Sequence, residues 1–302
     1  MKRGLLVLLA GWAIACAPAR AQGASPAPAA DLERLFASAS LWEVGTNTGE
    51  VRAAREALAA RGDEAIAFVL ARKIAAETTL EQRAIDELFG RVKEQAAPRV
   101  LAAMQDEARP AARVNLARLA RLLEIKQAVP VLVAWAGAID EAGEQRARRL
   151  AAQIAPALAA LDPARAFEVA WGWQAHRDPW VRVAAVRALG ATGSPDAAAA
   201  LAGIAGGGDT LLVRGAAALA LVEFGPRAAP ALEQALAACA AVDAKAPRCA
   251  FLVRAAADLA RSRAGTPEEQ SLRRALEKVA ALGPPALSRL TVALAFGEQL
   301  GP

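Results

Sequence analysis

The chain has 302 residues, 55% of them hydrophobic, with 36 basic and 31 acidic side chains and a formal net charge of +5. Its predicted mature form lacks Lys2, Arg3 and Arg20 and keeps 33 basic against 31 acidic residues, a balance that argues against nucleic-acid binding. Alanine dominates and tyrosine is absent, which favours closely packed layers of helices over one large central core.

Residues 1–21 are predicted to be a signal peptide. A basic start precedes an apolar run from Leu5 to Ala15, and a small-x-small motif ends at Ala21, after which we expect cleavage. The apolar run is too short to span a bilayer and no stop-transfer pattern follows it, so we expect no transmembrane segment in the mature chain. This pattern predicts a periplasmic or secreted protein. The alternative is a lipoprotein anchored through Cys16.

The remaining chain divides into a linker, two caps and an array of repeats. Residues 22–30 are rich in proline and alanine and predict a flexible linker. A helix that runs to about Trp42 begins the expected N-terminal cap, residues 31–46. Helical repeats are expected over residues 47–265, and two closing helices form a C-terminal cap over residues 266–300. Such caps are needed because a terminal repeat otherwise exposes its apolar face.

The best-formed repeat spans Asp178–Ala205 and predicts two helices joined by a tight turn. Asp178 is a helix N-cap residue, and Pro179 stands in the first turn, where a missing amide costs nothing. Apolar residues follow at steps of three and four, as on one face of a helix. Gly193 ends this helix and a Ser-Pro pair opens the next. Two short helices cannot bury such faces alone, so the unit must stack on neighbours.

Less regular copies of this unit recur on both sides, at a period of about 30 to 40 residues. Pro130 and Pro230 mark second helices of these copies, and Pro156 is assigned the same role. The fourth copy is longer than the others, and Asp162-Pro163 there predicts an additional helix. An arginine early in each first helix sets the register of the repeats, namely Arg52, Arg83, Arg113, Arg146, Arg182, Arg214 and Arg254.

These repeats resemble a HEAT-type α-solenoid of the short-repeat variety related to the phycobilisome-lyase repeats. The residues from Asp178 to Gly190 carry the resemblance best, followed by those from Leu212 to Leu221. The resemblance implies an all-α, right-handed solenoid of about seven HEAT-like helical pairs with helical caps. In this family the corresponding arginines generally join Asp/Arg ladders between repeats, and Asp178 lies four residues before Arg182. Anion binding is the alternative role for these register arginines.

Two cysteines remain in the predicted mature chain, Cys239 and Cys249. They lie ten positions apart, on either side of a proline-containing stretch. In an oxidising envelope compartment they are expected to form a disulfide that closes a short loop. A reactive thiol pair is the alternative, although the spacing is not C-x-x-C.

Half of the six tryptophans surround the only histidine in the chain. Trp171, Trp173, His176 and Trp180 are therefore possible partner contacts, because tryptophan is enriched at binding hot spots and histidine adds pH sensitivity. Trp135 is a further candidate. The alternative is that large rings fill an irregular joint in the stack.

The sequence predicts no catalytic, cofactor-binding or metal-binding residues. With a single histidine and no metal-binding or nucleophile motif, no site of recognisable spacing exists. We therefore expect a non-catalytic, exported scaffold that binds a protein or another envelope component. The alternative is a small-molecule carrier or lyase-like enzyme that uses a Trp/His pocket around residues 171–180. Recognition is expected on second-helix side chains of the curved surface, such as Arg72, Lys73, Arg99 and Trp135.

Overall fold

A computed structural model of the protein describes residues 28–106, 110–240, 246–283 and 285–296. The predicted signal peptide, the alternative lipid anchor at Cys16 and most of the predicted linker lie outside the described residues. The end of that linker is corrected, because the first helix already begins at Pro28. It ends at Ala39, before Trp42. Its inward side chains, among them Leu32 and Phe36, are buried, as a cap requires.

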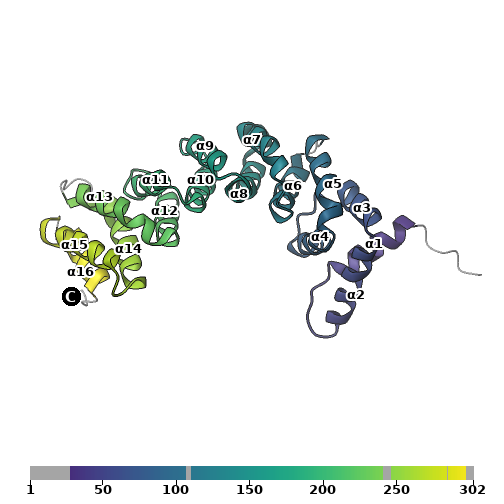
Figure 1. Ribbon diagram of the computed structural model, residues 1–302, viewed down its shortest axis with the longest axis horizontal. Helices are drawn as coiled ribbons and strands as arrows, with labels where there is room; N and C mark the ends of the chain where they lie inside the picture. Colours follow the sequence, from purple (N-terminus) through teal and green to yellow (C-terminus); the bar gives the residue numbers. More distant parts are fainter. Residues whose placement is uncertain (1–27, 107–109, 241–245, 284, 297–302) are drawn as a thin grey trace, which may run out of the picture.

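The described residues form α-helices, joined by short turns and 3-10 helices, and contain no β-strand. The helices follow one another along an arch (Figure 1). Their bounds are α1 Pro28–Ala39, α2 Asn47–Ala60, α3 Asp63–Arg72, α4 Thr79–Arg91, α5 Lys93–Asp106, α6 Pro110–Leu122, η1 Lys126–Ala128, α7 Val129–Gly137, η2 Ile139–Ala142, α8 Glu144–Leu161, α9 Pro163–Trp173, α10 Pro179–Thr192, α11 Pro195–Ala205, α12 Leu211–Phe224, η3 Gly225–Ala228, α13 Ala229–Ala240, α14 Ala246–Ser262, α15 Pro267–Leu282 and α16 Pro285–Phe296.

Helices α2 to α15 stack as seven consecutive pairs, with α1 and α16 at the two ends. The first helices of adjacent pairs pack on one another, as α10 does on α8 and α12, and they also pack on second helices, as α10 does on α9 and α11. In Figure 1 the first helices, which carry even numbers, line the inner side of the arch, and the second helices line its outer side. Between the two layers runs one continuous apolar core. The predicted all-α solenoid is thereby confirmed.

The central helix α10 shows why these residues form helices with these ends. The Asp178 carboxylate accepts a hydrogen bond of 2.8 Å from the amide of Trp180, and Pro179 occupies the first turn. At the other end Gly193 adopts φ 70°, a left-handed conformation that costs glycine little. The apolar face between them, with Val181 and Leu189 fully buried, lies against the neighbouring helices.

Asp162-Pro163 begins a helix in the fourth repeat, as predicted, but this helix is not an additional one. Helix α8 runs without interruption from Glu144 to Leu161 with Pro156 inside it, so α9 is simply the second helix of this pair. Proline removes the hydrogen bond to the carbonyl four residues earlier, here that of Ala152. Ala152 is exposed, so water can satisfy this carbonyl. The buried face of α8 against α6 and α10 holds the helix together across the proline.

Cys239 and Cys249 form a disulfide that joins the end of α13 to the start of α14, as predicted. Replacing both cysteines with serine is expected to lower the free energy of unfolding by about 2–3 kcal/mol, because the bond restricts a short loop in the unfolded chain. Urea denaturation with and without dithiothreitol tests this. The reductant should destabilise the wild-type chain by the same amount and leave the double variant unchanged. Equal stability of all forms would contradict the prediction.

Candidate functional site

The inner side of the arch exposes a distinct patch on two neighbouring first helices. First helices are covered by second helices behind them and by other first helices beside them, so the remaining stripe of each faces the inside of the arch. On α10 this stripe holds Trp180 and Arg187, seven residues apart. On α12 it holds Leu212 and Leu219, also seven residues apart. Trp180 is 48% exposed and Leu219 is 67% exposed. We call these four residues the inner patch.

Aspartates that cap or precede first helices connect the repeats behind this surface. Asp178 accepts a hydrogen bond of 2.7 Å from Arg148 of α8, in the preceding pair. Asp209, just before α12, accepts two bonds of 2.7 and 2.9 Å from Arg182 of α10. The predicted pairing of Asp178 with Arg182 is therefore wrong, although the Asp/Arg ladder itself exists. The cap bond directs the Asp178 carboxylate toward the start of α10, and there it contacts Arg148 of the previous repeat.

Both ladder aspartates are held in their charged form. Burial alone would raise the pKa of Asp178, but the hydrogen bonds from Arg148 and from the Trp180 amide outweigh burial and lower the pKa below 3.8. For Asp209 burial also opposes ionisation, and the hydrogen bonds from Arg182 and the Thr210 amide again lower the pKa. The ladder is thus fully charged at neutral pH.

The register arginines do not share one role. Arg214 is buried, donates to the carbonyl oxygens of Ala205 and Arg248, and lies over the ring of Phe251. Arg254, in contrast, is exposed, and among the described residues it pairs only within its own helix, with Asp258. The buried or bridging arginines that sequence reasoning missed are Arg55, which pairs with Glu43 and Glu87, Arg118, which pairs with Asp86, and Arg148.

The remaining register arginines lie nearer the surface. Arg52 and Arg83 both pair with Glu43, in a network at the N-terminal end of the arch. Arg113 lies 5.5 Å from the centre of the Trp135 ring. The side chain of Arg146 on α8 is exposed, and within the described part of the chain it donates only to the carbonyl oxygen of Ala142, at 3.5 Å. Of these four arginines, Arg146 therefore makes the weakest contacts with the described residues.

The aromatic residues predicted as partner contacts are not gathered at one place. Trp173 is buried and donates its indole N–H to the carbonyl oxygen of Ala136, and Trp135 is buried in the second-helix layer. The prediction that these two residues contact a partner is therefore wrong. Their rings belong to the apolar core, in the region where α7 packs on α9. Trp171 is exposed, but it lies on the second helix α9 and stacks on Phe167. Trp180 alone of this set belongs to the inner patch.

His176 serves as a link between repeats. Its Nε2 lies 3.0 Å from Asp140 Oδ1, and its Nδ1 accepts a hydrogen bond of 3.0 Å from the amide of Asp178. Both ring nitrogens are therefore occupied, and the ring is the donor at Nε2. Asp140 is the carboxylate partner that sequence reasoning missed, because it comes from the preceding repeat. The cavity beside this pair, of about 370 Å³, is lined by no serine, threonine or cysteine.

The second helices α3, α5 and α7, which carry or precede the side chains predicted to form the binding surface, line the outer side of the arch (Figure 1). Lys73 pairs with Glu33 and lies over the ring of Phe36. Arg99 pairs with Asp63 at 3.5 Å. The direction of curvature places first helices inside, so these second-helix side chains do not belong to the inner layer of the arch, and their role in recognition stays a prediction.

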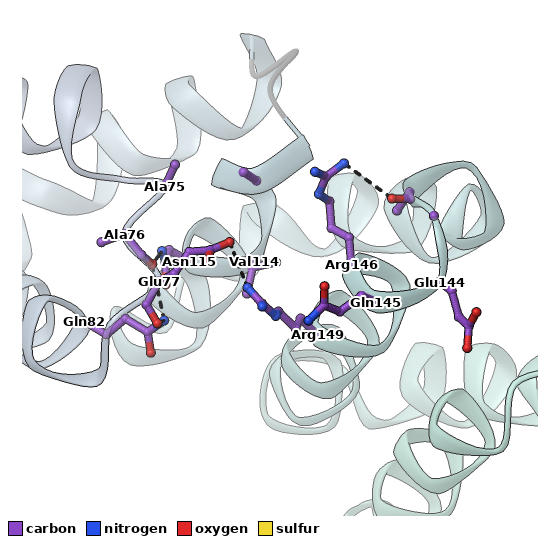
Figure 2. A pocket seen from close by; sticks show the side chains of 13 residues that line it. Ala75, Ala76, Glu77, Gln82, Val114, Asn115, Glu144, Gln145, Arg146 and Arg149 are labelled. Atoms are coloured by element: carbon purple, nitrogen blue, oxygen red, sulfur yellow. Dashed lines mark hydrogen bonds and ion pairs between the residues drawn. The ribbon is translucent and has the colours of Figure 1, made fainter.

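A separate cavity of about 380 Å³ lies at the edge of the arch where first helices begin (Figure 2). Its walls are the α3–α4 turn, the start of α6 and the start of α8. Figure 2 shows Glu77 of the turn reaching Arg149 of α8, with an oxygen–nitrogen distance of 2.8 Å. Asn115 of α6 fixes the turn from below by donating to the carbonyl oxygens of Ile74 and Ala76, at 2.7 and 2.9 Å.

Within the described residues no cluster of three or more histidine, cysteine, aspartate or glutamate side chains is arranged to hold a metal ion. In the same part of the chain no helix combines the length and the apolar character needed to cross a bilayer.

Stacked helical pairs linked by Asp/Arg ladders define the chain as an α-solenoid. The sequence model of the HEAT repeats family matches residues 138–222 and 170–246. Together these matches span residues 138–246, and this part of the chain is similar to HEAT repeats, as its sequence predicts. No curated protein matches it.

The solved structures that the chain matches have low sequence identity to it. The complex of CpcE and CpcF of phycocyanin lyase from Nostoc sp. PCC7120 is 18% identical, covers 87% of this chain and 97% of its own, and has a TM-score of 0.40. An engineered protein is 20% identical, with 84% and 98% covered and a TM-score of 0.40. Human deoxyhypusine hydroxylase in complex with glycerol is 16% identical, with 90% and 98% covered and a TM-score of 0.32.

Proposed function

We propose that this protein is a non-catalytic binding module that is exported to a bacterial cell envelope and holds a protein partner against the inside of its arch. The observation that carries the proposal is the inner patch. Trp180, Leu212 and Leu219 expose large apolar side chains on adjacent first helices, and Arg187 lies beside them. Tryptophan and arginine dominate binding hot spots, and clustered exposed apolar side chains mark interaction surfaces.

The alternative of a carrier or lyase-like enzyme with a Trp/His pocket finds less support. Trp171 lines a shallow apolar cavity between α9 and α11, whereas Trp173 and His176 line another between α7 and α9. Trp180 lines neither of these two cavities. Without a shared cavity these rings do not enclose a ligand, and His176 has no ring nitrogen available for proton transfer.

Export is supported by the sequence of residues 1–21 and by the disulfide between Cys239 and Cys249, a bond typical of oxidising compartments. Intact-mass measurement of the exported chain distinguishes the cleaved form from the lipid-anchored form. Cleavage after Ala21 leaves an unmodified chain, whereas the lipoprotein alternative leaves an acylated Cys16.

Site-specific photo-crosslinking in bacterial cells that naturally make this protein tests the binding function. A photoreactive phenylalanine analogue at position 180 is expected to trap a discrete protein band, and the same analogue at position 171, a similarly exposed tryptophan on the outer side, is not. With the trapped partner purified, Trp180→Ala should weaken binding at least tenfold, as for a hot-spot residue, while Trp171→Ala leaves it unchanged. Crosslinking from 171 alone, or from neither position, would refute the proposal.

A further inference from the structure

We infer that the inner patch binds an acidic, amphipathic segment of a partner protein. The apolar side chains of this segment cover the apolar part of the patch, and a carboxylate beside them pairs with Arg187. This inference rests on the proposed function, because it names the chemistry of the partner that the arch holds.

The two layers of the arch carry opposite charge in its central and C-terminal part. On the first helices α6, α8, α10, α12 and α14, arginines far outnumber aspartates and glutamates. On the second helices α7, α9, α11 and α13, acidic residues outnumber basic ones. Because the first helices line the inner side of the arch (Figure 1), this side is the more positive of the two. A positive concave surface favours a partner of negative charge.

Much of this positive charge is neutralised within the protein, but that of Arg187 is not. Arg148 and Arg182 pair with the ladder aspartates. Arg149 pairs with Glu77. Arg187 is exposed, and among the described residues neither an ion pair nor a hydrogen bond holds its guanidinium. A guanidinium that the fold leaves unpaired is available to a carboxylate of a partner, which it binds through two parallel N–H groups.

Arg187 lies beside the apolar side chains of the patch. It follows Trp180 by two helical turns on α10, so about 10 Å separate the two along one stripe. Helices α10 and α12 pack so closely that a Cβ added to Gly190 would lie 3.1 Å from the Cβ of Ala220. The two residues that meet there are the third after Arg187 and the first after Leu219, so Arg187 and Leu219 are neighbours across the two helices. A single segment can therefore contact the apolar side chains and Arg187 at once.

The charges beyond the patch determine the direction of the segment. On α12 the exposed carboxylate of Glu223 lies one turn beyond Leu219, and it repels an acidic group on that side. On the opposite side, α6 carries Arg121, which is exposed and makes neither a hydrogen bond nor an ion pair with the described residues. The segment therefore places its apolar end over α12 and its acidic end over α10, toward α8 and α6.

The curvature of the surface favours a protein over an anionic membrane. The inner patch lies on the inner side of the arch, between its two ends (Figure 1). A flat bilayer that meets the arch from this side touches the ends first and does not reach Trp180. Clustered apolar side chains at this place need a partner that enters the concave side.

NMR titration of the full mature chain, followed at the indole N–H of Trp180, tests the inference. The probe is a capped amphipathic peptide of leucine and glutamate, and its matched control has glutamine in place of every glutamate. The acidic probe is expected to bind about fivefold more tightly than the glutamine probe, and this advantage should shrink as sodium chloride rises from about 50 to 300 mM. The indole of Trp171, on the outer helix α9, should stay in place.

Arg187→Gln should remove most of the advantage of the acidic probe, because glutamine keeps a polar side chain but not the charge. Arg187 makes no pair within the described part of the fold, so this variant should keep the wild-type stability. The matched controls are Arg165→Gln, on the outer helix α9, and Glu223→Gln. The first should have no effect, and the second should not weaken binding of the acidic probe.

Equal affinity for the two probes, or an unchanged preference in the Arg187→Gln variant, would overturn the inference. So would a saturable shift of the Trp180 indole with phosphatidylglycerol vesicles that depends on Arg187, because it would identify a lipid surface as the occupant.

Mass-spectrometric sequencing of the segment trapped from position 180 separates this inference from the proposed function. A trapped segment that contains aspartate or glutamate beside apolar residues supports both. A trapped segment without acidic residues refutes the acidic partner and leaves the binding function standing. A preference for the acidic probe without any trapped protein refutes the binding function alone.

Discussion

Replacing Arg214 with alanine is expected to lower the free energy of unfolding by about 3 kcal/mol, whereas Arg254→Ala should change it by less than about 0.5 kcal/mol. Both arginines occupy the same register position in the sequence pattern. Arg214, however, is buried between α12 and α14, where it donates to two backbone carbonyl oxygens and covers Phe251. Its removal leaves these carbonyls without their donor and opens a void.

Arg254 is the matched control because the partner that it has among the described residues, Asp258, lies one turn away on the same helix, near the surface. Such a pair contributes little in water. Urea denaturation followed by circular dichroism gives both values. Equal losses for the two variants would show that the register position, and not the buried environment, determines the effect.

Replacing Asp178 with alanine is expected to cost about 2–3 kcal/mol at neutral pH, because it removes both the N-cap of α10 and the bond from Arg148. Asp178→Asn should cost less, since asparagine caps a helix as well as aspartate and loses only the charged pairing. The two variants therefore separate the contribution of the cap from that of the ladder.

The effect should also depend on pH, with a sign set by the lowered pKa of Asp178. A carboxylate whose pKa is lower in the folded chain stabilises it fully above the ordinary value of 3.8, and this contribution is lost as the pH falls through the lower, folded value. Wild-type and Asp178→Asn chains should thus differ most at about pH 6–7 and converge in strong acid, as measured by urea denaturation across roughly pH 2–7. A difference that stays constant over this range would contradict the role of Asp178.

The features that the sequence predicts well are local ones. The cap at Asp178, whose carboxylate accepts from the amide of Trp180, depends on residues two positions apart. The period of the repeats and the disulfide follow in the same way from spacing. Pro156 is the exception, because the packing of α8 on both neighbours overrides the local preference for a helix end.

The features that the sequence does not predict depend on how one repeat is rotated relative to the next. His176 meets Asp140, and Arg182 meets Asp209, across distances of 27 to 36 positions. The burial of Trp173 and the exposure of Trp180 both depend on which helix layer lies inside the arch. Small rotations between pairs add up to that curvature, and no single repeat encodes it.

The stacking of each pair on its immediate neighbours also determines the kinetics of folding. Segments that must meet are close along the chain, so little loop-closure entropy is lost before native contacts form, and folding is fast for a protein of this length. Synthesis from the N-terminus allows every new pair to dock on the one before it. The terminal pairs have one neighbour fewer than those around α10, and their amides therefore exchange with solvent by local opening long before the centre unfolds.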